Sequence, residues 1–491
     1  MRVIIASVLV ATVESHRNAG DTFVHLFEWS WSDIATECTT FLGPKGFAAV
    51  QISPPMEHIV GSEWWTRYQP VSYALESRSG TEAEFAAMVK TCAAAGVAIY
   101  ADAVLNHVAA GSGVGTNGTE YGTPKRTIAD LYSQRDFHNL GGDMSTNCVV
   151  SNYNDKHNVQ YCDLDGLPDL CTGCAYVRAT TAAYVERMAA LGVRGIRIDA
   201  AKHMDPGELA GLVATINTTS ALFIFQEVIG STGEAVRPDM YYDIGSVTEF
   251  KYGTQLGSNV MSDGKFQYLA NFGEGWGFMP AADAVVFTDN HDTQRGDATI
   301  TYKSGDLYTL ANVFMLAHPY GYPKVMSSYY FDGHDQGPPS APVHAGPGSA
   351  AAPGCADGTS WVCEHRRTAI ANMVAFRRAA ADAPLTNFTA AGPDTISFGR
   401  ADRAWIALNR GDHAWCATDV QTTMAPGTYC NVIAGYNVDV DGTSADHLRG
   451  CAESFSVDAT GVVASLSVPA HNAVALHANA RMHPMHKRSA L

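Results

Sequence analysis

The chain has 491 residues, of which 46% are hydrophobic and 16% charged, a composition typical of folded proteins and not of disordered ones. Its length exceeds what one ordinary hydrophobic core accommodates and predicts about three domains. The formal net charge of -17 argues against a nucleic acid or an anionic membrane as partner and agrees with a neutral substrate.

The N-terminus carries a short apolar run, Val3 to Val13, behind the basic Arg2. The run is too short to span a bilayer, which takes about 20 residues, and is typical of a secretory signal peptide. We therefore expect residues 1–20 to be a signal peptide and the protein to be secreted and extracellular. No later stretch is long and apolar enough to predict a membrane span. Eleven cysteines agree with an oxidising route, and their odd number leaves at least one thiol unpaired within the chain.

Predicted strands and helices alternate along the first hundred residues. The predicted elements are strands over Asp21–Trp29, Gly46–Pro54 and Val97–Val104 and helices over Ser32–Leu42 and Thr81–Ala95. Gly43-Pro44 is expected to stop the first helix, and a capping pattern from Thr81 to Glu84 to open the second.

Residues 108–172 interrupt this alternation, because they are rich in Gly, Asn, Asp, Ser and Thr and show little periodicity. The stretch is too long for a simple loop and predicts an inserted subdomain. The elements predicted after it are helices over Ala175–Leu191, Glu208–Ile216, Gly305–Ala317 and Ala369–Ala381 and strands over Gly195–Ala200, Leu222–Val228, Ser246–Phe250, Ala284–Asn290 and Tyr322–Ser328. The segment leading to the strand at Ala284 is expected to be rich in loops.

Eight strands separated by helices predict an α/β fold, a (β/α)8 TIM barrel over residues 21–107 and 173–392 with residues 108–172 inserted after its third strand. A doubly wound open sheet is the alternative, but no Gly-rich phosphate-binding turn follows the first strand. Short strands and turns predict a C-terminal antiparallel β-sandwich domain over residues 393–480. Residues 481–491 are expected to form a loose basic tail.

One predicted strand carries charges of both signs. Side chains alternate along a strand, so Arg197 and Asp199 lie on one face while Ile196 and Ile198 lie on the other. A buried ion pair adds little net stability because desolvation offsets its Coulomb energy. On this stretch alone, a functional site and a structural ion pair are equally good interpretations.

The carboxyl ends of barrel strands line one mouth, where the chemistry of this fold takes place. Asp199, Glu227 and Asp292 each lie at or just after the end of a different predicted strand, and three histidines and a lysine accompany them. Such a group indicates glycosidic bond cleavage, in which a pair of carboxylates straddles the sugar oxygen.

An aromatic loop after the second strand agrees with a sugar substrate. Trp64, Trp65 and Tyr68 would offer flat faces to pyranose rings, although core packing is the usual role of a tryptophan pair. Their neighbours Glu63, Thr66, Arg67 and Gln69 are polar, which favours a loop at the surface.

Six stretches carry a resemblance to a known family, namely Trp64–Tyr73, Asp102–His107, Gly195–Asp199, Phe225–Ile229, Phe287–Asp292 and Ala317–Gly321. They resemble the α-amylases of glycoside hydrolase family 13, in particular the animal-type, chloride-dependent branch. The likeness covers the chain from about Asp21 to Ala478. It implies a monomeric, endo-acting hydrolase of α-1,4-glucosidic bonds in starch, glycogen and malto-oligosaccharides, with a retaining mechanism through a covalent glycosyl-enzyme intermediate.

The resemblance implies a role for each carboxylate: Asp199 as nucleophile, Glu227 as general acid/base, and Asp292 as stabiliser of the transition state. This chemistry needs Asp199 ionised and Glu227 protonated, so their environments must differ. We expect Arg197 to lower the pKa of Asp199. The residues implied to bind substrate are Trp64, Trp65, Tyr68, Gln69, His107, Arg197, Lys202, His203 and His291.

Two ions are also implied by the resemblance. Calcium would join the inserted subdomain to the barrel through Asn106, Asp169 and the backbone carbonyls of Gln160 and His203, oxygen ligands of the kind that it prefers. Without the resemblance, Asp169 would be interpreted as a turn residue after Pro168.

Chloride would bind Arg197, Asn290 and Lys324, with lysine where vertebrate enzymes have arginine. Strand parity is expected to point Asn290 and Asp292 into the barrel. Two buried cations repel unless an anion lies between them. Because lysine cannot bind an anion bidentately, we expect weaker chloride binding here.

By family position, the expected disulfides are Cys38–Cys92, Cys148–Cys162, Cys355–Cys363 and Cys430–Cys451. Cys171 and Cys174 lack a second pair that would complete a zinc site, so a small disulfide is expected. The remaining Cys416 is expected to be buried as a small hydrophobic residue. Animal enzymes usually carry a Gly-rich loop with a histidine after the seventh strand, but here Arg295-Gly296-Asp297 leads directly into Ala298–Tyr302.

Two other functions remain open. An α-glucosidase or glucan transferase would share the same three carboxylates, and the sizes of the products from starch would distinguish them. A non-catalytic carbohydrate-binding protein would keep the barrel without the chemistry, but the intact carboxylate set argues against it.

Overall fold

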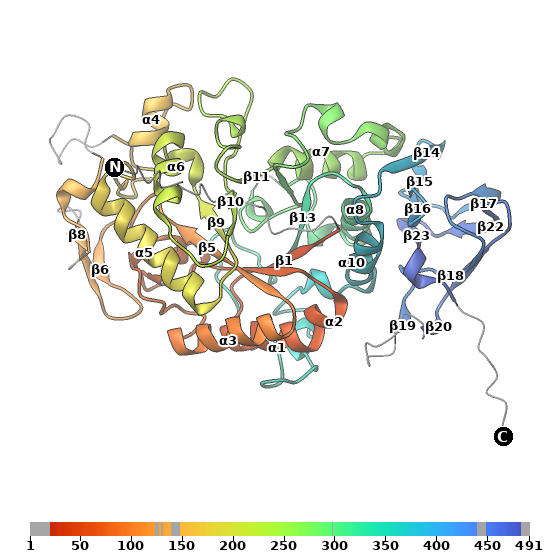
Figure 1. Cartoon of the computed structure of the whole chain (residues 1–491), viewed down its shortest axis with the longest axis horizontal. Coiled ribbons are helices and arrows are strands. Elements are labelled where there is room, and N and C mark those ends of the chain that lie inside the picture. The colour runs from red at the N-terminus through yellow and green to blue at the C-terminus, as the bar shows by residue number, and fades with distance from the viewer. Residues whose placement is uncertain are drawn as a thin grey trace, which may run out of the picture.

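The computed structural model describes residues 20–122, 127–128, 131–138, 148–296, 298–438 and 448–482. Eight parallel strands close into one barrel (Figure 1), in which each strand pairs with the next and β13 pairs with β1. The strands in barrel order are β1 (Phe23–Leu26), β2 (Ala49–Ile52), β5 (Ala98–Val104), β9 (Gly195–Asp199), β10 (Phe223–Gln226), β11 (Ser246–Thr248), β12 (Ala284–Val286) and β13 (Tyr322–Ser327). The predicted barrel is confirmed, and the open sheet is excluded.

Helices cover the outside of the barrel. They are α1 (Trp31–Glu37), α2 (Gly43–Lys45), α3 (Glu82–Ala94), α5 (Ala175–Leu191), α6 (Pro206–Thr215), α7 (Phe250–Met261), α8 (Asp306–Ala317) and α10 (Thr368–Ala380). The helix α3 begins with the predicted capping box, in which Thr81 and Glu84 satisfy each other's backbone N–H groups.

Three local predictions were wrong. The helical chain continues through Gly43-Pro44 and ends at Gly46, whose positive φ of 82° suits a helix terminus. The loop-rich segment before β12 contains the twelve-residue helix α7. The strand β12 ends at Val286, four residues earlier than predicted.

The segment between β5 and α5 consists of short elements, in agreement with its lack of periodicity. They are β6 (Ser112–Val114), β7 (Glu120–Gly122), β8 (Thr127–Ile128) and α4 (Lys156–Tyr161), while β3 (Glu57–His58) and β4 (Pro70–Ser72) lie in the loop after β2. A backbone bridge between His107 and Asp169 joins the beginning and the end of this segment.

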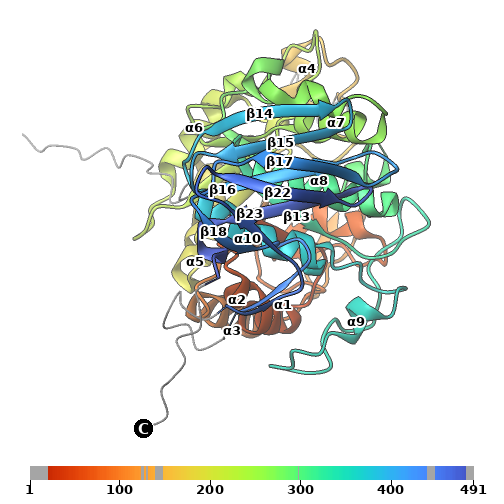
Figure 2. The same cartoon turned by 90° about the vertical axis from the view of Figure 1, so that its right-hand side faces the viewer.

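Two four-stranded antiparallel sheets form the C-terminal part. One contains β14 (Leu385–Gly392), β15 (Thr395–Arg400), β16 (Ala404–Asn409) and β23 (Asn472–His477), and the other β17 (Trp415–Gln421), β22 (Val462–Val468), β21 (Ser454–Val457) and β18 (Gly427–Cys430). A small pair, β19 (Tyr436–Val438) and β20 (Leu448–Cys451), lies beside them. Figure 2 shows these strands in front of α8 and α10.

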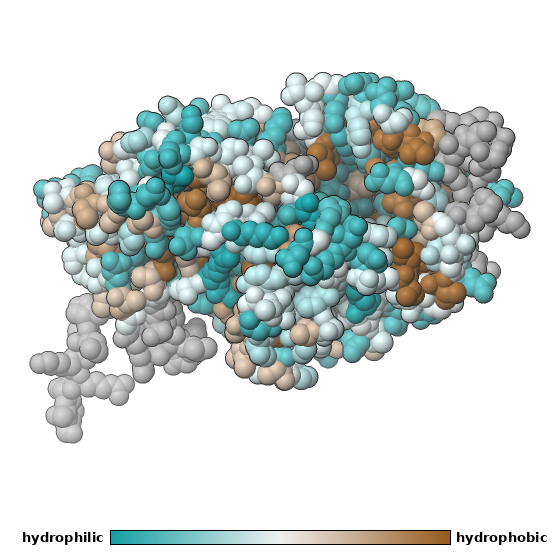
Figure 3. Space-filling view, turned by 180° about the vertical axis from the view of Figure 1, so that it is seen from behind, coloured by the Kyte–Doolittle hydropathy of each residue, from teal (hydrophilic) through white to brown (hydrophobic). Residues whose placement is uncertain are grey.

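The five expected disulfides are confirmed, including the short Cys171–Cys174 bridge. The prediction for Cys416 was wrong, because its side chain is exposed on β17, a strand at the edge of its sheet. The predicted signal peptide and basic tail lie almost wholly outside the described residues. Within the described part, no helix has the length and apolar character needed to cross a bilayer. Figure 3 shows small apolar groups scattered among hydrophilic residues on one face.

Aromatic rings fill the barrel interior at the amino ends of the strands, which we call the lower end. Phe23, Tyr100, Phe223, Phe225 and Tyr322 pack together there, with ring centroids between 4.7 and 6.3 Å apart. Gly195 belongs to this layer because a Cβ atom would lie 2.6 Å from the ring of Tyr100. The packed rings exclude water from below, so the charged residues of the next layer open only toward the mouth.

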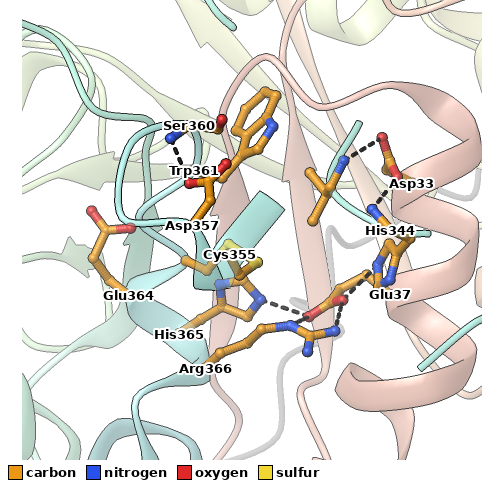
Figure 4. The surroundings of a disulfide bond; sticks show 12 residues. Asp33, Glu37, His344, Cys355, Asp357, Ser360, Trp361, Glu364, His365 and Arg366 are labelled. Atoms are coloured by element: carbon orange, nitrogen blue, oxygen red, sulfur yellow. Dashed lines mark hydrogen bonds and ion pairs between the residues drawn. A yellow bond between two sulfur atoms is a disulfide. The ribbon is translucent and has the colours of Figure 1, made fainter. Parts of the chain in front are cut away.

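A buried ion cluster connects α1 to the long connection between β13 and α10 (Figure 4). His365 Nε2 and Arg366 Nε each lie 2.8 Å from Glu37 Oε1, and His344 Nε2 lies 2.9 Å from Oε2. Burial alone raises the pKa of Glu37, but the hydrogen bonds from these three side chains outweigh it and hold the pKa below its usual range. The Cys355–Cys363 disulfide closes the same connection just before His365.

We expect Glu37→Gln to lower the free energy of unfolding by about 3 kcal/mol, because it leaves the half-buried Arg366 guanidinium without its counterion and removes a charged acceptor from two buried imidazoles. The matched control is Glu82→Gln, in a pair with Arg187 whose side chains are 34% and 48% exposed. Its expected cost is below about 1 kcal/mol. Denaturant unfolding measures both variants, and equal losses would contradict this account of the cluster.

Candidate active site

A cavity of about 570 Å³ opens at the carboxyl ends of the barrel strands. It is lined by the three predicted carboxylates and by eight of the nine predicted substrate-binding residues. The lining residues are Trp64, Trp65, Tyr68, Gln69, His107, Tyr153, Leu164, Asp165, Leu167, Asp199, Ala200, Lys202, His203, Glu227, Ile229, His291 and Asp292. The remaining predicted substrate-binding residue, Arg197, does not line the cavity but lies beneath its floor, inside the barrel.

Local backbone geometry brings Asp199 and Glu227 together at the ends of β9 and β10. After Asp199 the chain turns at Ala200, which has a left-handed φ of 48°. The N–H of Ala200 then donates to Glu227 Oε2 at 3.0 Å, while the N–H of Glu227 donates to the carbonyl of Ile198 at 3.0 Å. The strained turn therefore positions the carboxyl of the next strand directly.

Arg197 binds three carboxyls that come from three strands. Its Nη1 donates to Asp102 Oδ1 at 2.7 Å and to Asp199 Oδ1 at 2.9 Å, and its Nη2 lies 2.7 Å from Glu227 Oε1. The Arg197 side chain is 2% exposed. Parity along β9 is as predicted, since Arg197 and Asp199 share the inner face.

Arg197 lowers the pKa of Asp199 as expected, but burial has the larger effect. Burial raises the pKa of Asp199 well above its usual range; the Arg197 guanidinium opposes this, while Glu227 and Asp102 add to it. Burial also raises the pKa of Asp102. One guanidinium thus faces three neighbouring carboxyls, and burial favours the protonated forms of Asp199 and Asp102 by raising the pKa of each.

Asp292 completes the carboxylate set from the loop after β12. Burial at the base of the cavity and the neighbouring Glu227 raise the pKa of Asp292 to about 7, although 40% of its side chain faces the open space. His291 Nε2 lies 3.3 Å from Asp292 Oδ2. The ring of His291 stacks on that of Tyr68, with centroids 5.2 Å apart.

Two expectations about this region were wrong in detail. The polar neighbours of the tryptophans do not mark an exposed loop, because Arg67 is fully buried in an ion pair with Glu28 at 3.2 Å. Trp64 itself is only 8% exposed, in the cavity wall. Strand parity does not orient Asn290, because β12 ends before it and Asn290 Oδ1 accepts from the N–H groups of Asp292 and Thr293 in a turn.

Two models of protein families match the chain: the α-amylase catalytic domain over residues 46–220 and the α-amylase C-terminal all-β domain over residues 386–479. The α-amylase of Tribolium castaneum is 41% identical over 485 residues, which cover 94% of this chain and 95% of that protein. The chain belongs to the α-amylase family. The predicted family is thereby confirmed.

Other α-amylases are similar to the chain over most of its length. The α-amylase of Streptomyces violaceus is 43% identical over 455 residues, 91% of this chain and 76% of that protein. The solved structure of α-amylase I from Eisenia fetida matches with a TM-score of 0.84 and 37% identity, over 94% of this chain and 98% of that one. A variant of the same protein was solved as a complex with maltohexaose.

The side chains predicted to bind calcium leave buried oxygens without partners. Asn106 Oδ1 and Asp169 Oδ1 have no hydrogen bond among the described residues. Burial raises the pKa of Asp169 to about 7, although His138, 2.6 Å away, opposes this. An amide oxygen and a carboxyl oxygen, both buried and without hydrogen bonds, are donors of the kind that a hard cation prefers. The described residues contain no group of three or more His, Cys, Asp or Glu side chains suited to a metal ion. The expected calcium ligands are one carboxylate, one amide and two backbone carbonyls, so they do not form such a group.

The chloride candidates include a second buried cation. Lys324 is 1% exposed, its Nζ lies 4.7 Å from the centroid of Phe287, and it forms no hydrogen bond or ion pair with any described residue. Burial and the nearby Arg197 lower the pKa of Lys324 to about 7. In its protonated form, a buried lysine without an ion pair beside a second cation fits an anion.

Several residues of the cavity escaped the sequence analysis. Tyr153, Leu164, Asp165 and Leu167 come from the inserted segment, where no periodicity marks them. Glu234, in the loop after β10, binds Lys202 at 2.7 Å. A strand-end search could not find these residues, because loops and not strands place them.

Proposed function

We propose that the protein is a secreted, endo-acting hydrolase of α-1,4-glucosidic bonds in starch, glycogen and malto-oligosaccharides. One observation carries the proposal: Asp199, Glu227 and Asp292 meet at one aromatic-lined cavity, two of them bound to a single guanidinium. Membership of the α-amylase family supports the substrate class.

In the proposed reaction, Asp199 attacks the anomeric carbon while Glu227 donates a proton to the glycosidic oxygen, giving a covalent glycosyl-enzyme with release of the leaving chain. Glu227 then takes a proton from water, which attacks the anomeric carbon and frees Asp199. Asp292 stabilises the positive charge that develops on the sugar ring.

Aromatic and polar residues would bind the sugar chain on either side of these carboxylates. Trp64, Trp65 and Tyr68 offer ring faces, while Gln69, His107, Lys202, His203 and His291 offer hydrogen-bonding groups. These groups also have protein partners: for example, His107 Nε2 lies 2.9 Å from the carbonyl of Tyr68, His203 Nδ1 lies 3.0 Å from that of Val159, and Lys202 Nζ lies 2.7 Å from Glu234 Oε2. Arg197 acts indirectly, by orienting the carboxyls.

We further propose that calcium binds Asn106, Asp169 and the carbonyls of Gln160 and His203, and that chloride binds Arg197, Asn290 and Lys324. Calcium would hold the inserted subdomain, residues 108–172, against the barrel. Chloride would compete with Glu227 for the Arg197 guanidinium, which favours Glu227 as proton donor. We propose that the protein is a monomer of three domains. The barrel comprises residues 21–107 and 173–392, the inserted subdomain residues 108–172, and the C-terminal domain residues 393–480.

We expect Glu227→Gln to lower kcat on soluble starch by about 10³-fold, because general acid/base catalysis contributes that much. The matched control is Glu249→Gln at the end of β11, whose carboxylate accepts from the N–H groups of Lys251 and Met279 outside the cavity. Full activity in Glu227→Gln would contradict the proposed mechanism. Mixed oligomers early in the wild-type reaction would support internal cleavage, whereas glucose alone or longer transfer products would indicate a glucosidase or a transferase.

We expect removal of calcium by a chelator to lower the Tm, because a ligand that binds only the folded state stabilises it. Asp169→Asn should reduce this chelator-induced shift, since it removes the single carboxylate of the set. Differential scanning calorimetry in calcium and in chelator measures both proteins. Equal Tm values for the wild type in the two buffers would contradict the calcium site.

The pKa of Lys324 predicts a pH-dependent response to chloride. Above pH 7 the side chain loses its proton, so the chloride concentration for half-maximal activity should rise by about tenfold per pH unit if binding needs the cation. Lys324→Arg should remove that dependence, because arginine stays charged. Titrations of activity with chloride between pH 6 and pH 9 test this, and a constant half-maximal concentration in the wild type would contradict it.

A further inference from the structure

Arg295 lies three residues after Asp292 in a cage of four aromatic rings. Its guanidinium carbon lies 5.3 Å from the ring centroid of Phe27, 5.1 Å from that of Trp64, 5.2 Å from that of Tyr329 and 4.3 Å from that of Phe331. The rings come from three places at the barrel mouth: the end of β1, the turn after β2 and the loop after β13. Such contacts stabilise a cation that is withdrawn from water.

The hydrogen bonds of Arg295 run to the backbone of the active-site loop. Its Nη1 donates to the carbonyl of His291 at 2.6 Å, and its Nη2 donates to the hydroxyl of Tyr329 at 2.8 Å. That hydroxyl in turn donates to the carbonyl of Gln336 at 2.6 Å. Arg295 has no carboxylate within ion-pair distance among the described residues, so its bonds position neutral groups instead of balancing a charge.

The arrangement connects this guanidinium to two parts of the cavity wall. The His291 carbonyl belongs to the peptide unit that joins His291 to Asp292, whose carboxyl faces the cavity. Trp64 also lines the cavity, and its indole Nε1 donates to the carbonyl of His334 at 3.0 Å. Movement of Arg295 would therefore shift the Asp292 carboxyl, while Trp64 keeps a second, independent hydrogen bond.

We propose that Arg295 is a positioning residue, which fixes the Asp292 carboxyl for the transition state through its hydrogen bond to the His291 carbonyl and is itself held by the aromatic cage. The inference rests on the proposed function, because it assigns a role in that reaction. A reacting group displaced by about 1 Å costs on the order of a hundredfold in rate, so one such bond matters.

The test compares two substitutions at Arg295 with a control at Lys303. Arg295→Met keeps the packing against the rings but removes both donors, whereas Arg295→Lys keeps the charge and one donor. Lys303→Met is the matched control, since Nζ of Lys303 also lies 4.3 Å from the Phe331 centroid and donates to the Phe331 carbonyl, but Lys303 does not line the cavity.

We expect Arg295→Met to lower kcat on a malto-oligosaccharide at least tenfold with KM changed less than about threefold, because Trp64 keeps its place. Arg295→Lys should recover part of the lost kcat, and Lys303→Met should stay within twofold of the wild type. A purely structural role would lower the amount of folded enzyme, so kcat is measured per active site and each Tm is recorded.

Wild-type kcat in Arg295→Met, or an equal loss in Lys303→Met, would overturn the proposal. If Arg295→Met does not fold, Arg295→Lys and Tyr329→Phe take its place, and unchanged kcat in both would overturn it equally. Full activity in Glu227→Gln marks failure of the proposed function. An inactive Glu227→Gln beside a fully active Arg295→Met marks failure of this inference alone.

Discussion

The contact of one buried guanidinium with three carboxyls is the constraint on which the rest of the site depends. Asp102, Asp199 and Glu227 come from three neighbouring strands, and like charges so close in a water-poor interior repel strongly. Arg197 makes their assembly possible, and it can do so only because the closed barrel points all four side chains at one another. One cation against three acids does not offset burial, which raises the pKa values of Asp199 and Asp102.

The aromatic layer of the barrel explains why the charges of Arg197 and its three carboxyls interact strongly. Aromatic rings seal the lower end, so water reaches the carboxyls only through the cavity and the local dielectric screening is weak. Lys324, also buried and near Arg197 inside the barrel, is a second basic side chain that has no ion pair with a carboxylate among the described residues. Burial therefore raises the pKa of Asp199 and lowers that of Lys324, so it favours the neutral form of each side chain.

Buried charges also fix the segments around the cavity. Glu37 ties α1 to His344, His365 and Arg366, more than 300 residues away in the chain. Arg295 ties the loop after β12 to rings from both ends of the barrel sequence. In both places a charged group is satisfied by neighbours that only tertiary folding supplies, so a loop gains a defined position without belonging to a helix or strand.

The sequence by itself determined the eight-stranded barrel, the C-terminal sheets and the three carboxylates of the cavity, because periodicity and strand-end motifs are local signals. The disulfides Cys38–Cys92, Cys148–Cys162, Cys355–Cys363 and Cys430–Cys451 followed from the resemblance to the family. Only the tertiary structure decided the pKa direction of Asp199, the turn that holds Asn290, the exposure of Cys416, the helix α7 and the cage around Arg295. The pKa of Asp199 and the cage around Arg295 depend on groups distant in the chain and on burial, since solvation and Coulomb energies are set by neighbours in space.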